Sequence, residues 1–153
     1  MNGYRERLGK RRSKGFSLVE VMIAILVMGL GLLGFALLQT MSVRFTQSAN
    51  HRTQATNLAS DMLDQMRVNR LLAGQYVGNY AAATTGCTPD GTVTVDKYKV
   101  IWRCRLGTAL GAGASAVVTY NNGLARVSIT WADQRWEADA SQRNKTFQTE
   151  TRL

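Results

Sequence analysis

The apolar and polar positions divide the chain into three stretches. From Phe16 to Leu38 the sequence runs for 23 residues without Lys, Arg, Asn, Gln or His, and it holds one carboxylate, Glu20. About 20 helical residues span the hydrocarbon core of a membrane. The first stretch therefore predicts a transmembrane helix over residues 16–38. A carboxylate inside such a segment is costly, which makes Glu20 a candidate functional residue.

The second stretch, residues 39–73, continues as an amphipathic helix. No Pro or Gly interrupts it, and apolar side chains such as Met41, Phe45, Ala55, Met62 and Met66 recur at spacings of three and four. Polar residues fill the opposite face: Gln47, Asn50, Gln54, Asn57, Asp61 and Asp64. The pattern predicts one long helix that ends at about Leu72.

The third stretch, residues 74–153, predicts a small globular β domain. Residues 74–91 are rich in Gly, Asn, Thr and Ala and indicate a loop. Strands are predicted at 98–105, 117–120, 124–132 and 146–153, with a flexible connection at 107–113 and a tight turn at 121–123. We expect Trp102 and Trp131 to be core residues and Trp136 to cover them as a lid. The whole pattern predicts an α+β fold, a long helix packed on an antiparallel sheet.

The distribution of charge argues against a nucleic-acid-binding protein. The formal charge is +9, but residues 1–15 carry six Lys or Arg and one Glu, so the leader holds +5 and the remainder +4. The basicity is mostly a leader property, and a nucleic-acid partner is disfavoured. A basic strip of Lys97, Lys99, Arg103 and Arg105 along one strand is the only feature that would favour one.

Catalytic and cofactor motifs are not found. His51 has no ligand-forming neighbour at metal spacing, and no Ser/His/Asp set or CxxC pair occurs. Gly29, Gly31 and Gly34 spell a G-x-G-x-x-G motif, but it lies inside the apolar run without a preceding strand, so a dinucleotide site is rejected. We expect no enzyme activity, no cofactor and no metal.

Two cysteines, Cys87 and Cys104, follow the apolar run. If the basic leader stays in the cytoplasm, both cysteines lie outside it, where a disulfide is the default state. Two reduced, buried thiols are the alternative.

The junction at Gly15 decides what kind of membrane segment this is. The apolar run is longer than the core of a secretory signal peptide, which has about 7–15 residues, and no cleavage motif follows it. A plain signal anchor explains neither Gly15-Phe16 nor Glu20. The hexapeptide Gly15-Phe16-Ser17-Leu18-Val19-Glu20, between a basic leader and an apolar helix, resembles the class III signal of type IV prepilins.

This resemblance implies a set of site residues and partners. Prepilin peptidase would cut between Gly15 and Phe16 on the cytoplasmic side, remove the leader 1–15 and N-methylate Phe16. Glu20 would make an assembly contact that sets subunit register. The implied partners are prepilin peptidase, other minor pilins, the major pilin, the inner-membrane assembly machinery and a tip adhesin.

Residues 58–69, which read LASDMLDQMRVN, resemble the end of the long helix in PilV-type minor pilins, as do the Gly31–Gly34 stretch and Gln39. Major pilins often carry a proline where this chain has Leu37. The resemblance implies a single-pass inner-membrane protein with a periplasmic domain, later in a pilus fibre or tip, that supports twitching motility and adhesion. Two alternatives stay open: a minor pseudopilin of a type II secretion system, and a DNA-uptake pilin.

Overall fold

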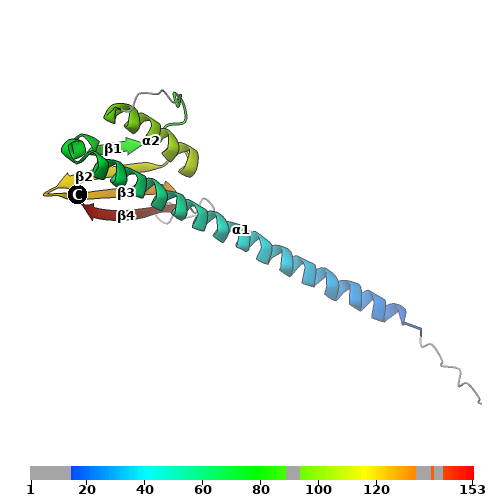
Figure 1. Ribbon diagram of the computed structural model, residues 1–153. Coiled ribbons are helices and arrows are strands. Elements are labelled where there is room, and N and C mark those ends of the chain that lie inside the picture. The colour runs from blue at the N-terminus through cyan, green and yellow to red at the C-terminus, as the bar shows by residue number, and fades with distance from the viewer. Residues whose placement is uncertain (1–14, 89–93, 134–138, 140–142) are drawn as a thin grey trace, which may run out of the picture. The chain divides into compact units, whose positions relative to one another are not determined.

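The computed structural model describes residues 15–88, 94–133, 139 and 143–153. The chain divides into two compact units, with the boundary between Ser42 and Val43. One helix, α1 (Leu18–Val68), runs through both. The other elements belong to the globular unit, residues 43–153: η1 (Arg70–Tyr76), β1 (Gly78–Ala81), α2 (Val95–Leu110), β2 (Ser115–Asn121), β3 (Leu124–Ala132) and β4 (Asn144–Arg152) (Figure 1).

The four strands form one antiparallel sheet in chain order, β1-β2-β3-β4. The β2–β3 hairpin turns at Asn122 and Gly123, whose φ angles are 49° and 78°. Positive φ at both central positions is what a tight hairpin turn requires, and Asn-Gly provides it at low cost. The predicted turn and the predicted strand 124–132 are confirmed, and so are strands near 117–120 and 146–153.

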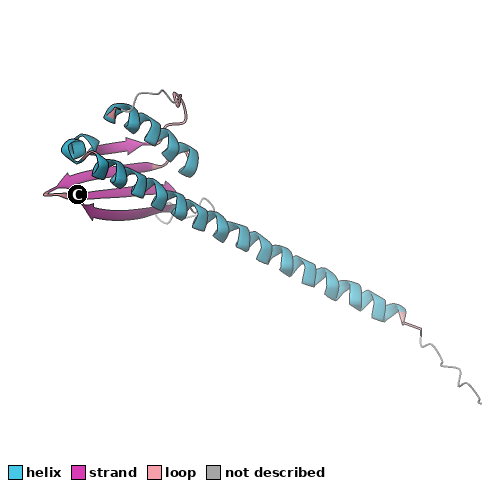
Figure 2. Ribbon diagram, in the orientation of Figure 1, coloured by secondary structure: helices cyan, strands magenta, loops and turns pink. Residues whose placement is uncertain are grey.

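One face of the sheet is buried and the other is exposed. Val118, Val127, Ile129 and Trp131 point into the core, while Val117 and Arg126 alternate with them on the outer face. The helices α1 and α2 lie over the buried face (Figure 2). The predicted architecture, a long helix packed on a small antiparallel sheet, is confirmed.

Helix α1 contributes an apolar stripe to this core only from Ala55 onward: Ala55, Leu58, Ala59, Met62, Leu63 and Met66. Earlier apolar positions of the same helical pattern are exposed, including Met41 at 52% and Phe45 at 70%. The α-helix also ends at Val68 rather than at about Leu72, because the chain tightens into the 3₁₀ turn η1 at Arg70.

The predicted strand at 98–105 is wrong, because this segment lies within α2. Thr94 caps the helix by accepting a hydrogen bond from the backbone N–H of Lys97. The buried side chains Trp102, Leu106 and Leu110 recur every four residues, which is a helical period. The aromatic and β-branched composition of YKVIWRCR was misread as strand propensity. The connection predicted at 107–113 is therefore helical up to Leu110, and Gly111 follows with a φ of 92°.

The missing strand is found in the segment predicted as a loop. Gly78–Ala81 forms β1, which pairs with β2 from Gly78↔Val118 to Ala81↔Ser115. Trp102 packs edge-on against Tyr80 at a ring distance of 5.3 Å and donates its indole N–H to the carbonyl of Leu58. Trp102 and Trp131 are core residues as predicted, whereas Trp136 lies outside the described residues.

Candidate functional site

The junction predicted for cleavage is an uncovered piece of backbone that lies before the first helix. Gly15 is exposed, and a Cβ built on it would meet no atom within 4 Å. Phe16 is 83% exposed, and α1 begins two residues later at Leu18. Backbone in this state is accessible to a peptidase. The basic leader that precedes it, residues 1–14, lies outside the described residues.

Glu20 lies in the first turn of α1, where a carboxylate interacts favourably with the helix dipole. Glu20 and Phe16 line the same shallow, mostly apolar hollow on the helix surface, together with Val21, Ala24, Ile25 and Met28. Phe16 and Glu20 therefore lie on one side of the chain. In the described part of the chain no cation pairs with Glu20.

The apolar side chains that follow Glu20 have no cover within the N-terminal unit. The helix that contains them is long and apolar enough to cross a membrane, and none of its apolar 18-residue window is buried. Gly29, Gly31 and Gly34 are open on the helix surface, with no atom within 4 Å of a built Cβ. Surface of this kind requires lipid or other chains around it.

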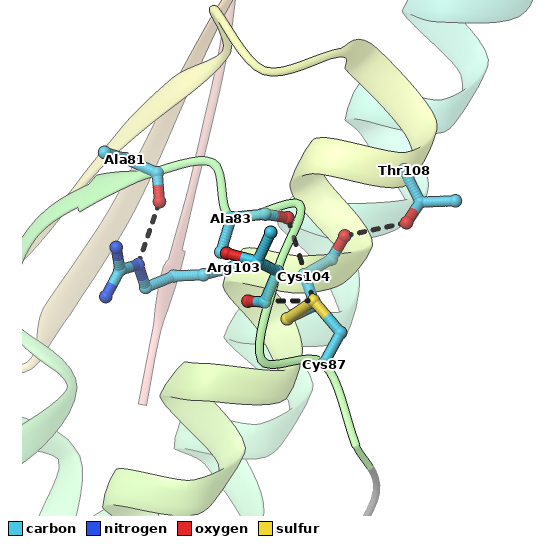
Figure 3. Close-up of a disulfide and its surroundings, with 7 residues drawn as sticks. Ala81, Ala83, Cys87, Arg103, Cys104 and Thr108 are labelled. Atoms are coloured by element: carbon cyan, nitrogen blue, oxygen red, sulfur yellow. Dashed lines mark hydrogen bonds between the residues drawn. A yellow bond between two sulfur atoms is a disulfide. The ribbon is translucent and has the colours of Figure 1, made fainter.

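In the globular unit Cys87 and Cys104 form a disulfide (Figure 3). It joins the loop after β1 to helix α2, because Cys104 lies in the segment 98–105 that the sequence pattern predicted as a strand. Two contacts support the same junction: the Ala83 N–H donates to the Arg103 carbonyl over 3.0 Å, and the Arg103 guanidinium donates to the Ala81 carbonyl over 2.8 Å. The disulfide thus reinforces a backbone contact between β1, its loop and α2.

The backbones approach closely at Gly107, which faces this loop. A Cβ placed on Gly107 would lie 2.3 Å from the carbonyl oxygen of Ala83. Glycine is therefore the residue that lets α2 pack against the loop at this distance.

A polar contact that the sequence did not predict joins α1 to α2. The Asp61 carboxylate accepts from the Tyr98 hydroxyl at 3.1 Å and from the Arg105 guanidinium at 3.0 Å. Burial, and then the Asp61 charge and hydrogen bond, raise the pKa of Tyr98 well above its ordinary value of 10.0. The sequence pattern places Asp61 on the polar face of the long helix, and the helical period of residues 95–110 is the signal that links it to Tyr98.

The predicted basic strip along a strand is wrong. All four residues lie on α2. Lys99 pairs with Asp96, the Arg103 guanidinium donates to the Ala81 carbonyl, and Arg105 pairs with Asp61. The alternation that would have aligned them exists only in a strand. The feature that favoured nucleic-acid binding is thereby removed.

His51 is half-buried on α1, and its Nδ1 is buried with no hydrogen-bond partner among the described residues. Within residues 15–88, 94–133, 139 and 143–153, no group of three or more His, Cys, Asp or Glu side chains is placed to hold a metal ion.

Two family profiles match the chain. The profile described as a prokaryotic N-terminal methylation motif matches residues 10–36, and the profile described as type IV pilin Tt1218 matches residues 37–100. Neither the curated proteins nor the solved structures contain a significant match. The first profile covers the junction at Gly15 and Phe16 and the apolar helix, which indicates a membrane-anchored chain that is processed as a prepilin.

The second profile covers the rest of α1 and extends into α2. Type IV pilins are structural subunits rather than enzymes. Over residues 10–36 and 37–100 the chain is therefore similar in turn to the methylation motif and to a type IV pilin, and its long helix packed on a four-stranded antiparallel sheet is consistent with the type IV pilin fold.

Proposed function

We propose that this chain is a minor pilin of the PilV type, which prepilin peptidase matures and which joins, or primes the assembly of, type IV pili. The observation that carries the proposal is the methylation motif matched over residues 10–36. This match includes the exposed Gly15-Phe16 junction, which lies directly before an apolar helix. The minor-pilin assignment is supported by the residues 58–69, which resemble PilV-type proteins.

In this proposal the peptidase cuts after Gly15, where no side chain hinders access to the backbone. The product begins at Phe16, whose nitrogen becomes an amino group and is methylated. This group does not exist in the uncleaved chain, where Phe16 nitrogen belongs to a peptide bond. Processing therefore creates a cation at the end of the apolar helix.

Glu20 is the acid that this new cation would meet. A carboxylate in an apolar environment needs a positive partner, and the described part of the chain supplies none. In an assembly, Glu20 of one subunit pairs with the Phe16 amino group of a neighbour and fixes their register. Buried charge pairs are suited to specifying an arrangement.

The two units fit two compartments. The apolar helix holds the subunit in the inner membrane, while the disulfide-bonded globular unit lies in the periplasm, where disulfides persist. After assembly the subunit is part of the fibre or its tip, with other minor pilins, the major pilin and a tip adhesin as neighbours. In this role it supports pilus biogenesis, twitching motility and adhesion.

The mass of the mature protein tests the maturation step. The expected product begins at Phe16 and carries one added methyl group. Replacement of Gly15 by a bulky residue, Gly15→Leu, should leave full-length precursor in the membrane fraction. A mature product of normal mass from Gly15→Leu would refute the cleavage site. Gly29→Leu, deeper in the same helix, is the matched control and should be processed normally.

The assembly contact is tested by Glu20→Ala. The variant should be processed but poorly incorporated into pili, with reduced piliation and twitching. Normal piliation would mean that Glu20 has no assembly role. Deletion of the gene for this protein distinguishes the alternative. If the deletion abolishes secretion of folded proteins but leaves pili intact, the protein is a type II secretion pseudopilin instead.

A further inference from the structure

A small polar pocket in the globular unit has no role in maturation or assembly as proposed above. It has a volume of about 280 Å³ and lies where α1 meets the ends of β3 and β4. This is just below the roughly 300–1,000 Å³ typical of drug-sized ligand sites, so the pocket has room only for a small ligand. The lining side chains that matter are Ser48, Arg52, Trp131, Asp133, Lys145 and Phe147.

The pocket has two cations without partners. Among the described residues, no hydrogen bond or ion pair engages the side chains of Arg52 or Lys145. The carboxylate of Asp133 lines the same pocket, yet it pairs with neither cation. Two cations against one carboxylate leave the lining with an excess positive charge, which favours an anionic ligand.

Asp133 is fixed in place by the chain. It is only 8% exposed, and it accepts a hydrogen bond from the Ser48 hydroxyl over 2.5 Å. Its backbone N–H donates to the Arg143 carbonyl over 2.9 Å. A rigid, buried carboxylate is an acceptor for ligand hydroxyl groups, and it disfavours an anion that brings no donor.

Aromatic rings form the apolar part of the lining. Trp131 is 3% exposed and Phe147 is half-buried, and both contribute to the pocket surface. The indole N–H of Trp131 is buried without an acceptor in the described part of the chain. A buried donor without a partner is unfavourable, so a ligand rich in oxygen acceptors suits this environment.

We propose that this pocket binds an acidic sugar, with Arg52 and Lys145 holding its carboxylate and Asp133 accepting from its hydroxyl groups. Trp131 and Phe147 would contact the apolar face of the ring. The ligand class is a uronic acid or a similar carboxylated sugar, and the pocket size fits a single ring. The site would give a pilus subunit a chemical target on anionic polysaccharide.

The test is a titration of the processed full-length protein in detergent micelles with galacturonate, galactose and inorganic phosphate. The indole N–H signal of Trp131 in the ¹⁵N spectrum reports the pocket, and that of Trp102 reports the fold. Galacturonate should shift the Trp131 signal in a saturable manner. Galactose and phosphate should bind about tenfold more weakly or not at all, because each satisfies only one half of the lining.

Variants assign the contacts. Arg52→Gln and Lys145→Gln should each weaken galacturonate binding about tenfold, while Arg70→Gln, an exposed arginine outside the pocket, should not change it. Asp133→Asn should weaken galacturonate without weakening phosphate. If Arg52→Gln or Lys145→Gln unfolds and loses the Trp102 signal, the other of the two variants shows whether the pocket cations bind galacturonate.

Three results would overturn the proposal. They are no saturable shift with galacturonate, phosphate binding as tight as galacturonate binding, and a loss of galacturonate affinity in Arg70→Gln as large as that in Arg52→Gln and Lys145→Gln. The outcome is independent of the proposed function. A subunit that binds galacturonate but is neither cut nor assembled contradicts only the pilin role. A subunit that is cut and assembles without binding contradicts only the sugar site.

Discussion

The hydroxyl of Tyr98 on α2 donates to the carboxylate of Asp61 on α1 across 3.1 Å, and Arg105 completes the cluster from the next turns of α2. The two residues are 37 positions apart in the sequence. Their contact holds the two helices that cover the sheet together, next to the edge-on pair of Tyr76 and Tyr98.

Tyr98→Phe should lower the free energy of unfolding by about 1–2 kcal/mol, because it removes one hydrogen bond to a charged group and keeps the ring. Urea denaturation followed by tryptophan fluorescence measures this, since Trp102 and Trp131 are buried in the core of the globular unit. Tyr120→Phe is the control, because the Tyr120 hydroxyl on β2 makes no hydrogen bond among the described residues. Equal losses in both variants would mean that the Asp61 contact contributes nothing.

Alkaline pH should weaken the fold through the same residue. The pKa values of Tyr98 and Tyr80 are raised in the folded chain, mainly by burial, so the unfolded chain loses these protons first. Their contribution to stability is fully present below pH 10 and is lost as the pH rises above it, by up to about 1.4 kcal/mol per pH unit for each group.

In Tyr98→Phe the decline of unfolding free energy between pH 10 and 11 should be shallower, because only Tyr80 of this pair remains. Urea midpoints at pH 9, 10 and 11 give the slope for each protein. A slope unchanged by Tyr98→Phe would contradict the raised pKa.

The sequence pattern predicted β3 at its observed bounds, Leu124–Ala132, because strict alternation and the adjacent Asn-Gly turn are local signals. It failed at β1, where Gly78, Asn79 and Ala81 are residue types depleted in strands and only Tyr80 favours one, since pairing with β2 stabilises this strand. It also failed at α2, where aromatic composition outweighed the four-residue period of Trp102, Leu106 and Leu110.

The functional residues also fall into those that the sequence predicts and those that only the fold brings together. Gly15, Phe16 and Glu20 are neighbours in sequence, so their motif could be read without a structure. Asp61 with Tyr98, and Ser48 with Asp133, are joined only by the packing of helices on the sheet. Such contacts require the tertiary fold, and the wrong assignment of α2 as a strand hid the first of them.

The disulfide should contribute substantially to the stability of the globular unit. Cys87 and Cys104 are 17 residues apart, and closing a loop of this size is expected to contribute about 3 kcal/mol. The double variant Cys87→Ala/Cys104→Ala should therefore denature at clearly lower urea concentration, as should the wild type under reducing conditions. The urea midpoint of the double variant should be the same with and without reductant, because no disulfide is left to break. An unchanged midpoint in both tests would show that the backbone contacts alone hold the loop.

Gly107→Ala should destabilise the globular unit, because the added methyl group has no room. The added Cβ would lie 2.3 Å from the Ala83 carbonyl oxygen and 3.0 Å from its carbon, and both are backbone atoms. Relief requires α2 and the disulfide-bonded loop to separate, which also weakens the hydrogen bond from Ala83 N–H to the Arg103 carbonyl. We expect a loss of about 1–3 kcal/mol in unfolding free energy, the usual cost of overpacking.

Gly113→Ala is the matched control, because a Cβ at Gly113 meets no atom within 4 Å. It should stay within about 0.5 kcal/mol of the wild type. The measurement is the urea midpoint of both variants under oxidising and reducing conditions. Reduction frees the loop to move, so the deficit of Gly107→Ala relative to its background should shrink when the disulfide is broken. If Gly107→Ala loses the same unfolding free energy in both conditions, the disulfide-bonded loop does not limit the space at Gly107, and the proposed origin of the loss is wrong.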